Sequence, residues 1–238
     1  MKTKMKKTAK LFFIAILLLT CVHVSAQKKH KYVDLGLPSG TMWATCNLGA
    51  NNPEDYGDYL AWGENTPKAK YNWSNYKFCK GSNKTLTRNC NNPKFGYNGF
   101  IDNYYGLNGG DDPACHNWGL GWHIPSIEHW EELYNNTTST WTCRNGVYGM
   151  LFTGRNGKSI FLPAAGYRTD GELNLAGSNC VYWSDAILSW YSRDKQDYGR
   201  FDNTPSRAML VGFKSDRFYQ GNDERCYGLP VRPIYEDW

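Results

Sequence analysis

The stretch N-W-G-L-G-W-H-I-P-S-I-E-H-W-E-E-L, from Asn117 to Leu133, carries the clearest local signals in the chain. Pro125 disfavours helical angles at the residue before it, and Ser126 offers a hydroxyl to the free amides of a new helix. Apolar residues then recur at helical spacing while glutamates face away. The stretch therefore predicts a helix that begins after Ser126 and buries one face, formed by Ile127, Trp130, Leu133 and Tyr134.

Short strand patterns lie on both sides of this predicted helix. Upstream, residues 32–35 and 41–46 flank a Gly- and Pro-containing turn. Downstream, residues 140–143 and 147–153 flank Arg144-Asn145-Gly146, which is a hairpin signal. One helix followed by hairpin-linked strands predicts an α+β fold with an antiparallel sheet. The further expected strands are 159–163, 182–184, 207–213 and 229–234, the last at an edge because it contains prolines.

The first 26 residues have the pattern of a secretory signal peptide. Five lysines precede an apolar run over residues 11–19, and Val24-Ser25-Ala26 follows as a small-residue cleavage site. The alternative is cleavage before Cys21 and a lipid anchor on that cysteine. The run is too short to span a membrane, and no transmembrane segment is predicted. We expect export to the periplasm, the cell surface or the medium, with a basic tail over 27–31 and a single domain over 32–238.

Removing the signal peptide changes the charge balance. The chain has 27 basic and 22 acidic residues, and five of the lysines lie in the signal peptide. The remainder therefore has 22 of each, a net charge of zero. A neutral chain without a basic stripe gives no support to nucleic-acid binding.

Aromatic residues make up 16% of the chain, and they continue through a region without periodicity over residues 64–113. We expect this region to be a loop-rich insertion that packs on the domain, because it is too aromatic to be disordered. Seven cysteines remain after Cys21, and export makes disulfides plausible. Cys79 and Cys90 are the local candidates for a pair, and the odd count leaves at least one cysteine free or paired between chains.

Several segments, in order along the chain, match the pattern of one protein family: 32–49, 56–64, 111–125, 141–142, 159–168, 177–178, 182–184 and 231–233. Together they resemble the Fibrobacter succinogenes major paralogous domain family, which is common in secreted proteins of Bacteroidetes. The resemblance implies a C-type-lectin-like α+β fold whose terminal strands pair and whose ligand region is a long loop between late strands. The chain departs from the family pattern at His123, where arginine is usual, and at Asp185. Cys180 and Cys226 also depart from it and suggest a private disulfide.

His123, His129 and Glu132 form the nearest approach to a metal-binding pattern. His129 and Glu132 are three residues apart and could share a helix face, with His123 just upstream. A catalytic metal needs about three convergent ligands and an open position. The alternative is a solvated helix face, because the apolar face of this helix is already accounted for.

The segment after residue 182 combines aromatic rings with carboxylates and amides. Exposed rings can stack on sugar faces while polar groups bond hydroxyls; the alternative is a minor core under a long loop. Oxygen ligands in such a loop also suit calcium, but a salt-bridged loop explains them equally. The candidate ligand-binding residues are Trp183, Asp185, Trp190, Tyr191, Asp194, Asp197, Tyr198, Phe201, Asp202 and Asn203.

No nucleophile motif or phosphate loop occurs in the chain. We therefore predict an exported, non-enzymatic protein without an obligatory cofactor, which binds a glycan or a surface protein through the late aromatic loop. Two alternatives stay open. One is an enzyme on a scaffold like that of the formylglycine-generating enzymes, centred on the His123 group or on Cys226. The other is a structural surface component without a fixed ligand. The oligomeric state does not follow from the sequence.

Overall fold

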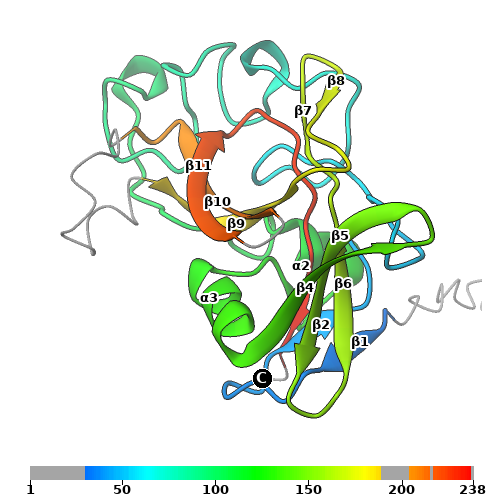
Figure 1. Cartoon of the computed structure of the whole chain (residues 1–238). Helices are drawn as coiled ribbons and strands as arrows, with labels where there is room; N and C mark the ends of the chain where they lie inside the picture. The colour runs from blue at the N-terminus through cyan, green and yellow to red at the C-terminus, as the bar shows by residue number, and fades with distance from the viewer. Residues whose placement is uncertain (1–29, 189–203, 215–216, 237–238) are drawn as a thin grey trace, which may run out of the picture.

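The computed structural model describes residues 30–188, 204–214 and 217–236. Within these residues the protein is an α+β structure with antiparallel sheets and two α-helices, as the sequence predicted (Figure 1). The expected signal peptide, the residues that join it to His30 and most of the late aromatic loop lie outside the described residues. No helix of the described part is long and apolar enough to cross a membrane.

The first and last described strands belong to one sheet. Strand β1 (Tyr32–Asp34) pairs with β2 (Met42–Ala44), and β2 pairs with β12 (Ile234–Tyr235). The other edge of β12 pairs with β3 (Trp122–His123), which lies within the Asn117–Leu133 stretch. The two ends of the described chain are therefore held together by backbone hydrogen bonds.

Helix α3 (Ile127–Asn136) begins where the sequence predicted. The Ser126 hydroxyl accepts from the amide of His129, and the His129 ring accepts from the amide of Ser126, so both free donors are satisfied. Ile127, Trp130 and Leu133 are buried, and Trp130 contacts the ring of Trp43 at 4.7 Å between centroids. The helix therefore packs its apolar face on the main core.

A second helix, α2 (Pro113–Trp118), was not predicted. The Asp112 carboxylate caps it by accepting from the amides of Ala114 and Cys115. The same carboxylate accepts from the amide of Ile124, which ties α2 to the chain that enters α3. Gly119 ends the helix with a φ of 96°, an angle that favours glycine.

Two three-stranded sheets form the rest of the scaffold. The predicted hairpin is confirmed as β4 (Thr137–Arg144) and β5 (Val147–Gly154), joined by Asn145 and Gly146 at positive φ, and β6 (Ser159–Pro163) pairs with β5. The other sheet has the order β11–β10–β9. Its strands are β9 (Cys180–Ile187), β10 (Arg207–Lys214) and β11 (Arg217–Glu224), and a small hairpin of β7 (Tyr167–Thr169) and β8 (Glu172–Asn174) lies near it.

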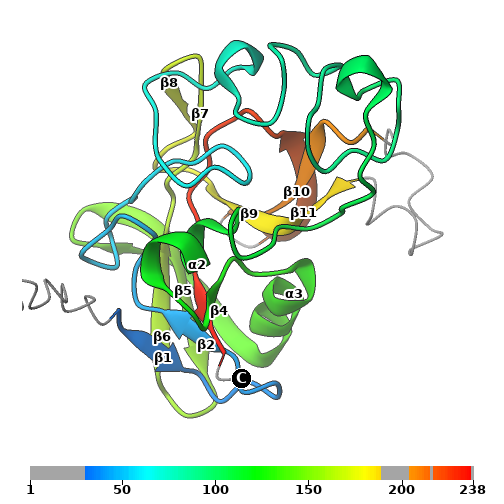
Figure 2. The same ribbon diagram turned by 180° about the vertical axis from the view of Figure 1, so that it is seen from behind.

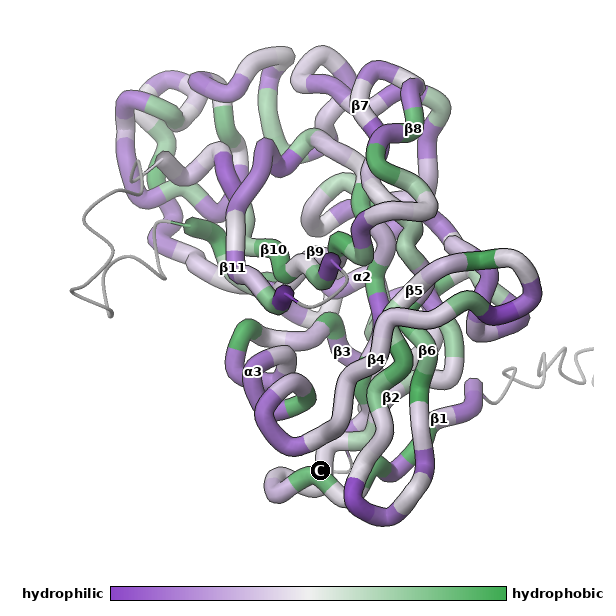
Figure 3. The backbone as a smooth tube through the Cα atoms, viewed as in Figure 1, coloured by the Kyte–Doolittle hydropathy of each residue, from purple (hydrophilic) through white to green (hydrophobic). Residues whose placement is uncertain are grey.

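The β9–β10–β11 sheet separates two parts of the core because its side chains alternate between faces. Tyr182, Val211 and Phe213 point into the main core with Trp130 of α3. Val181 and Leu210 point to the other face, into a second core with Trp62 and Leu229. Figure 3 shows hydrophobic residues along β9 and β10 and hydrophilic ones at the hairpin turns. The side chains that point to this second face, Val181 and Leu210 among them, line a pocket on the surface of the sheet.

The segment 64–112 contains two 3-10 helices, η1 (Trp73–Asn75) and η2 (Tyr97–Gly99), and isolated bridges, in agreement with the expected irregular insertion. It lies at the opposite end of the molecule from the C-terminus in both views (Figures 1 and 2). It packs around its own cluster, which includes Tyr76, Leu86 and Cys226. Arg225 is fully buried there and donates to the Tyr76 hydroxyl and to the carbonyl of Pro205. That side chain fastens the insertion to the chain before β10.

Candidate functional site

A pocket of about 250 Å³ lies on the second face of the β9–β10–β11 sheet, beside the β7–β8 hairpin. Two tyrosine rings line it, its floor is aliphatic, and one carboxylate lies at its edge. The volume is a little below the range of about 300–1,000 Å³ that is usual for drug-sized ligands. We call it the tyrosine pocket; it is lined by Tyr167, Leu175, Val181, Leu210, Tyr219, Gly221, Asn222, Asp223 and Leu229.

Gly212 of β10 allows the Tyr219 ring to lie against the sheet. The two residues are paired across β10 and β11. A Cβ atom at position 212 would lie 2.0 Å from Cζ of Tyr219, which is far too close. The missing side chain therefore lets the ring lie over the strand instead of pointing away from it. Tyr219 keeps 38% of its surface exposed, so its ring is available to a ligand.

The aliphatic floor comes from the central strands. Val181 of β9 and Leu210 of β10 lie on the same face of the sheet, and Leu229 lies beside them in the second core. Gly221 is opposite Leu210 on β11, and a Cβ at 221 would lie 3.3 Å from Cδ1 of that leucine. A side chain at Gly221 would therefore crowd the floor, and the glycine keeps it open.

Asp223 supplies the charge at the edge of the tyrosine pocket. Burial raises the pKa of its carboxyl, while Arg207, 3.7 Å away, opposes that rise. One carboxylate oxygen accepts from the amide of Glu224. The Arg207 guanidinium also donates to the backbone carbonyl of Asn222 at 3.1 Å, so it fixes this end of β11. The carboxylate is thus held by neighbours and retains acceptor positions for hydroxyl groups.

The opposite wall of the tyrosine pocket comes from the β7–β8 hairpin. Tyr167 stacks on Tyr227 with 6.2 Å between ring centroids and an angle of 18° between planes. Reciprocal backbone hydrogen bonds between Arg168 and Gly228 hold β7 against the C-terminal segment. Leu175, which follows β8, is half exposed and also lines the pocket. Tyr167 and Tyr219 therefore both lie on strands that backbone hydrogen bonds hold to other segments of the chain.

The predicted late-loop site is only partly within the described residues. Trp183 is buried, and its indole N–H donates to the carbonyl of Leu60 at 2.8 Å, so it packs in the second core and offers no surface to a ligand. This corrects its prediction as a ligand-contacting ring. The remaining candidates, apart from Asp185, lie outside the described residues: Trp190, Tyr191, Asp194, Asp197, Tyr198, Phe201, Asp202 and Asn203.

Asp185 of β9 lies beside the start of α3 and does not line the tyrosine pocket. Its amide donates to the carbonyl of Pro125, and its own carbonyl accepts from the amide of Leu107. Burial raises the pKa of the carboxyl to about 7, and the carboxylates of Glu128 and Asp112 add to the rise. One carboxyl oxygen is buried without a hydrogen-bond partner among the described residues. A direct role in binding stays a prediction.

The three metal candidates each have a structural partner instead. His129 caps α3 and its Nε2 lies 3.1 Å from Oε1 of Glu236. Glu132 accepts from the amide and hydroxyl of Ser39 at 2.8 and 2.6 Å. His123 lies 3.7 Å from Asp112, whose carboxylate raises the pKa of the imidazole. Within the described part of the chain no group of three or more His, Cys, Asp or Glu side chains could hold a metal, which corrects the metal hypothesis.

All seven cysteines of the described residues are free thiols. Cys180 lies in the main core and donates to the carbonyl of Leu162, while Cys226 lies in the cluster under the insertion. Their separation into different clusters gives no support to the suggested Cys180–Cys226 pair. Cys79 and Cys90 share the insertion cluster, but each thiol donates to a backbone carbonyl and no bond joins them.

Sequence reasoning did not select Tyr167, Tyr219 or Asp223. The segment containing Tyr219 and Asp223 is polar, and only its pairing with the apolar β10 makes it a strand. Gly212 and Gly221 occupy strand positions where a side chain would otherwise cover the face of the sheet. Their lack of side chains was the signal in the sequence for an open surface at this face. Comparisons with known protein families, with curated proteins and with solved structures give no match for the chain.

Proposed function

We propose that this protein is an exported, non-enzymatic binding protein that holds one sugar residue of a glycan in the tyrosine pocket. The observation that carries the proposal is the pairing of two tyrosine rings with a fixed carboxylate around an aliphatic floor. Sugar rings have apolar C–H faces that lie on aromatic rings and hydroxyls that donate to carboxylates. Tyr167 and Tyr219 supply the rings, and Asp223 supplies the acceptor.

The tyrosine pocket lies on the face of the β9–β10–β11 sheet, whereas the sequence predicted a glycan site in the late loop. The late loop joins β9 to β10, two of the strands that form the pocket floor. Residues of that loop therefore remain candidates for further contacts, while the tyrosine pocket is sufficient to define a first subsite.

We further propose that the fold is C-type-lectin-like and that the chain is related to the major paralogous domain family. The pairing of β1 and β12 with β2 supports this, because the resemblance implies that the terminal strands pair. The long connection between β9 and β10 also agrees with the expected position of a ligand loop.

Glycan-array screening followed by titration tests the proposed function. We expect Tyr219→Ala to weaken binding of an array-positive glycan at least tenfold, because losing a stacking ring and its buried area costs about 1.5 kcal/mol or more. Gly212→Ala is expected to weaken binding similarly, because the added methyl displaces the Tyr219 ring. Isothermal titration calorimetry measures both effects.

Tyr97→Ala is the matched control, because Tyr97 is 44% exposed in the insertion and does not line the pocket. It should leave the affinity unchanged. Equal affinity of the wild-type protein and the Tyr219→Ala and Gly212→Ala variants would contradict the proposed site. Circular dichroism of each variant shows that the fold is retained.

A further inference from the structure

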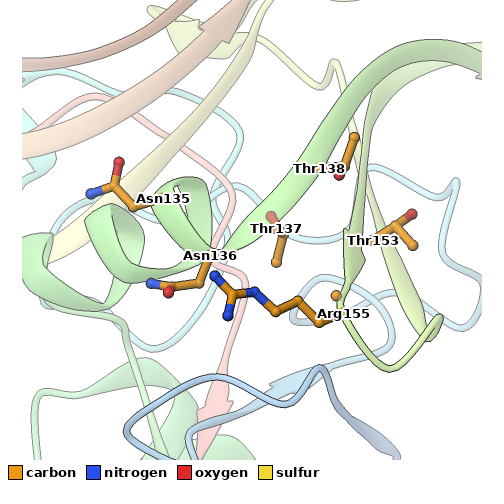
Figure 4. Close-up of a pocket in the computed structure, with 7 residues that line it drawn as sticks. Asn135, Asn136, Thr137, Thr138, Thr153 and Arg155 are labelled. Carbon is orange, nitrogen blue, oxygen red and sulfur yellow. The ribbon is translucent and has the colours of Figure 1, made fainter.

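A second pocket of about 260 Å³ lies where α3 passes directly into β4, and it shares no lining residue with the tyrosine pocket. Its lining is almost entirely polar, with two amides, three hydroxyls and one guanidinium. Figure 4 shows the Arg155 side chain reaching back from the β5–β6 turn toward Asn136. We call it the corner pocket; it is lined by Asn135, Asn136, Thr137, Thr138, Thr153, Gly154 and Arg155.

The corner pocket is built on rigid backbone. Thr137 ends α3 and is also the first residue of β4, so no loop separates helix from strand. Thr137 pairs with Gly154 across β4 and β5, and Thr138 pairs with Thr153. A Cβ at Gly154 would lie 2.0 Å from the carbonyl oxygen of Leu35, so close packing fixes this end of β5. The threonine side chains on these strands therefore keep their positions without a ligand, and Arg155 follows β5 directly in the β5–β6 turn.

The net charge of the lining is positive. Arg155 is its one charged residue, and its guanidinium has no hydrogen-bond or ion-pair partner among the described residues. A guanidinium binds a carboxylate through two parallel hydrogen bonds. The electrostatics of the corner pocket therefore favour a ligand that carries a carboxylate.

The remaining polar groups select a ligand with hydroxyls as well. The Asn136 amide nitrogen donates to the carbonyl of Glu132 at 2.9 Å, and the Thr137 hydroxyl donates to that of Leu133 at 2.6 Å. These bonds cap α3 and leave Asn136 Oδ1 and Thr137 Oγ1 as acceptors, together with the second N–H of the Asn136 amide as a donor. Acceptors repel a bare anion but receive hydroxyl protons. A ligand that offers a carboxylate to Arg155 and hydroxyls, which both donate and accept, to the neighbouring amides and hydroxyls fits this lining.

We propose that the corner pocket binds a sugar acid, a hexuronate residue, with its carboxylate on Arg155 and its hydroxyls on Asn136 and Thr137. The site is separate from the tyrosine pocket and does not depend on the function proposed for it. An acidic glycan would then bind at two separate places, with a hexuronate residue in the corner pocket and another sugar residue in the tyrosine pocket.

This proposal is tested by titrating the full chain with glucuronate, glucose or inorganic phosphate while nuclear magnetic resonance monitors the amide chemical shifts. We expect saturable shifts at residues 135–138 and 153–155 with glucuronate, and at least tenfold weaker effects with glucose or phosphate. Arg155→Gln should weaken glucuronate binding about tenfold or more, because it removes the charged fork. Arg155 is exposed at a turn, so this variant keeps the fold.

Arg217→Gln is the control, because Arg217 is exposed at the start of β11 and does not line the corner pocket. It should bind glucuronate as the wild-type protein does, and so should Tyr219→Ala. Three results would overturn the proposal: no saturable glucuronate shifts, equal binding of phosphate, or unchanged affinity in Arg155→Gln. Failure of the Tyr219→Ala glycan test would leave this result unaffected, so the two proposals are distinguishable.

Discussion

Replacing Arg232 with methionine is expected to lower the free energy of unfolding by about 3 kcal/mol. The guanidinium is fully buried and donates to Asn47 Oδ1 at 2.8 Å, to the carbonyl of Ala44 at 3.0 Å and to that of Phe161 at 2.8 Å. Among the described residues no carboxylate pairs with it. Methionine fills much of the volume but leaves three buried acceptors without a donor.

Two effects oppose each other in this variant. Removing a buried cation recovers part of its desolvation cost, and burial already lowers the pKa of this guanidinium. Each unsatisfied acceptor costs about 1–3 kcal/mol, and three of them exceed that recovery. Arg232 also joins β2 to β6, so its loss separates two sheets. The net effect is therefore a large destabilisation.

Urea unfolding followed by circular dichroism measures the difference. Arg232→Lys should also destabilise the protein, because an ammonium cannot reproduce the planar fork that reaches three acceptors. Arg217→Met, at the exposed first residue of β11, should stay within about 0.5 kcal/mol of the wild type. Wild-type stability in Arg232→Met would show that the buried network does not hold the sheets together.

Replacing Asp185 with asparagine is expected to raise the free energy of unfolding above pH 7 by about 4 kcal/mol. Burial raises the pKa of Asp185 from 3.8 to about 7 in the folded protein, and the negative charges of Glu128 and Asp112 contribute. Asparagine has the same shape and stays neutral, so it avoids burying a charge. The gain should be absent near pH 3, where the wild-type carboxyl is protonated in both states.

The direction of this pH dependence follows from the numbers of protons that the folded and unfolded states bind. Between about pH 4 and pH 7 the folded protein holds a proton on Asp185 that the unfolded chain releases. The contribution of Asp185 to stability is therefore present below pH 4, decreases as pH rises through that window, and levels off above pH 7. Other carboxyls titrate in the same window, so the difference between wild type and variant at each pH isolates this residue.

Urea unfolding from pH 3.5 to pH 8 tests this dependence. Asp34→Asn is the control, because Asp34 is exposed and the amide oxygen of asparagine can still accept from the amide of Gly36. Its stability should follow the wild type at every pH. A constant difference between wild type and Asp185→Asn across the range would mean that the carboxyl does not titrate as its burial requires.

The parts of the fold that local chemistry determines were predictable from the sequence. Ser126 and Pro125 set the start of α3, and Asn145-Gly146 set the β4–β5 turn with both residues at positive φ. Two signals of the same kind were present and were not used. Asp112-Pro113 is a cap followed by proline at the first helical position, and Asp170-Gly171 is a hairpin turn between β7 and β8.

The rest depends on contacts between segments far apart in the chain. Strand β11 is polar, and its position follows from pairing with β10. Arg225 and Arg232 are buried because backbone carbonyls from several segments surround them, and no residue pattern encodes that. The tyrosine pocket similarly combines a hairpin, two central strands and an edge strand. The sequence predicted aromatic recognition in the late loop, whereas the site proposed from the structure lies on the face of the sheet.

The most direct test of the tyrosine pocket is nuclear magnetic resonance of tyrosine rings labelled in the full chain and titrated with an array-positive glycan. The ring signals of Tyr167 and Tyr219 should shift together and saturate at one affinity, because both rings line the same pocket. The ring of Tyr97, which is exposed elsewhere, should not shift. Saturable shifts that leave both Tyr167 and Tyr219 unchanged would contradict the account and place glycan recognition elsewhere on the protein.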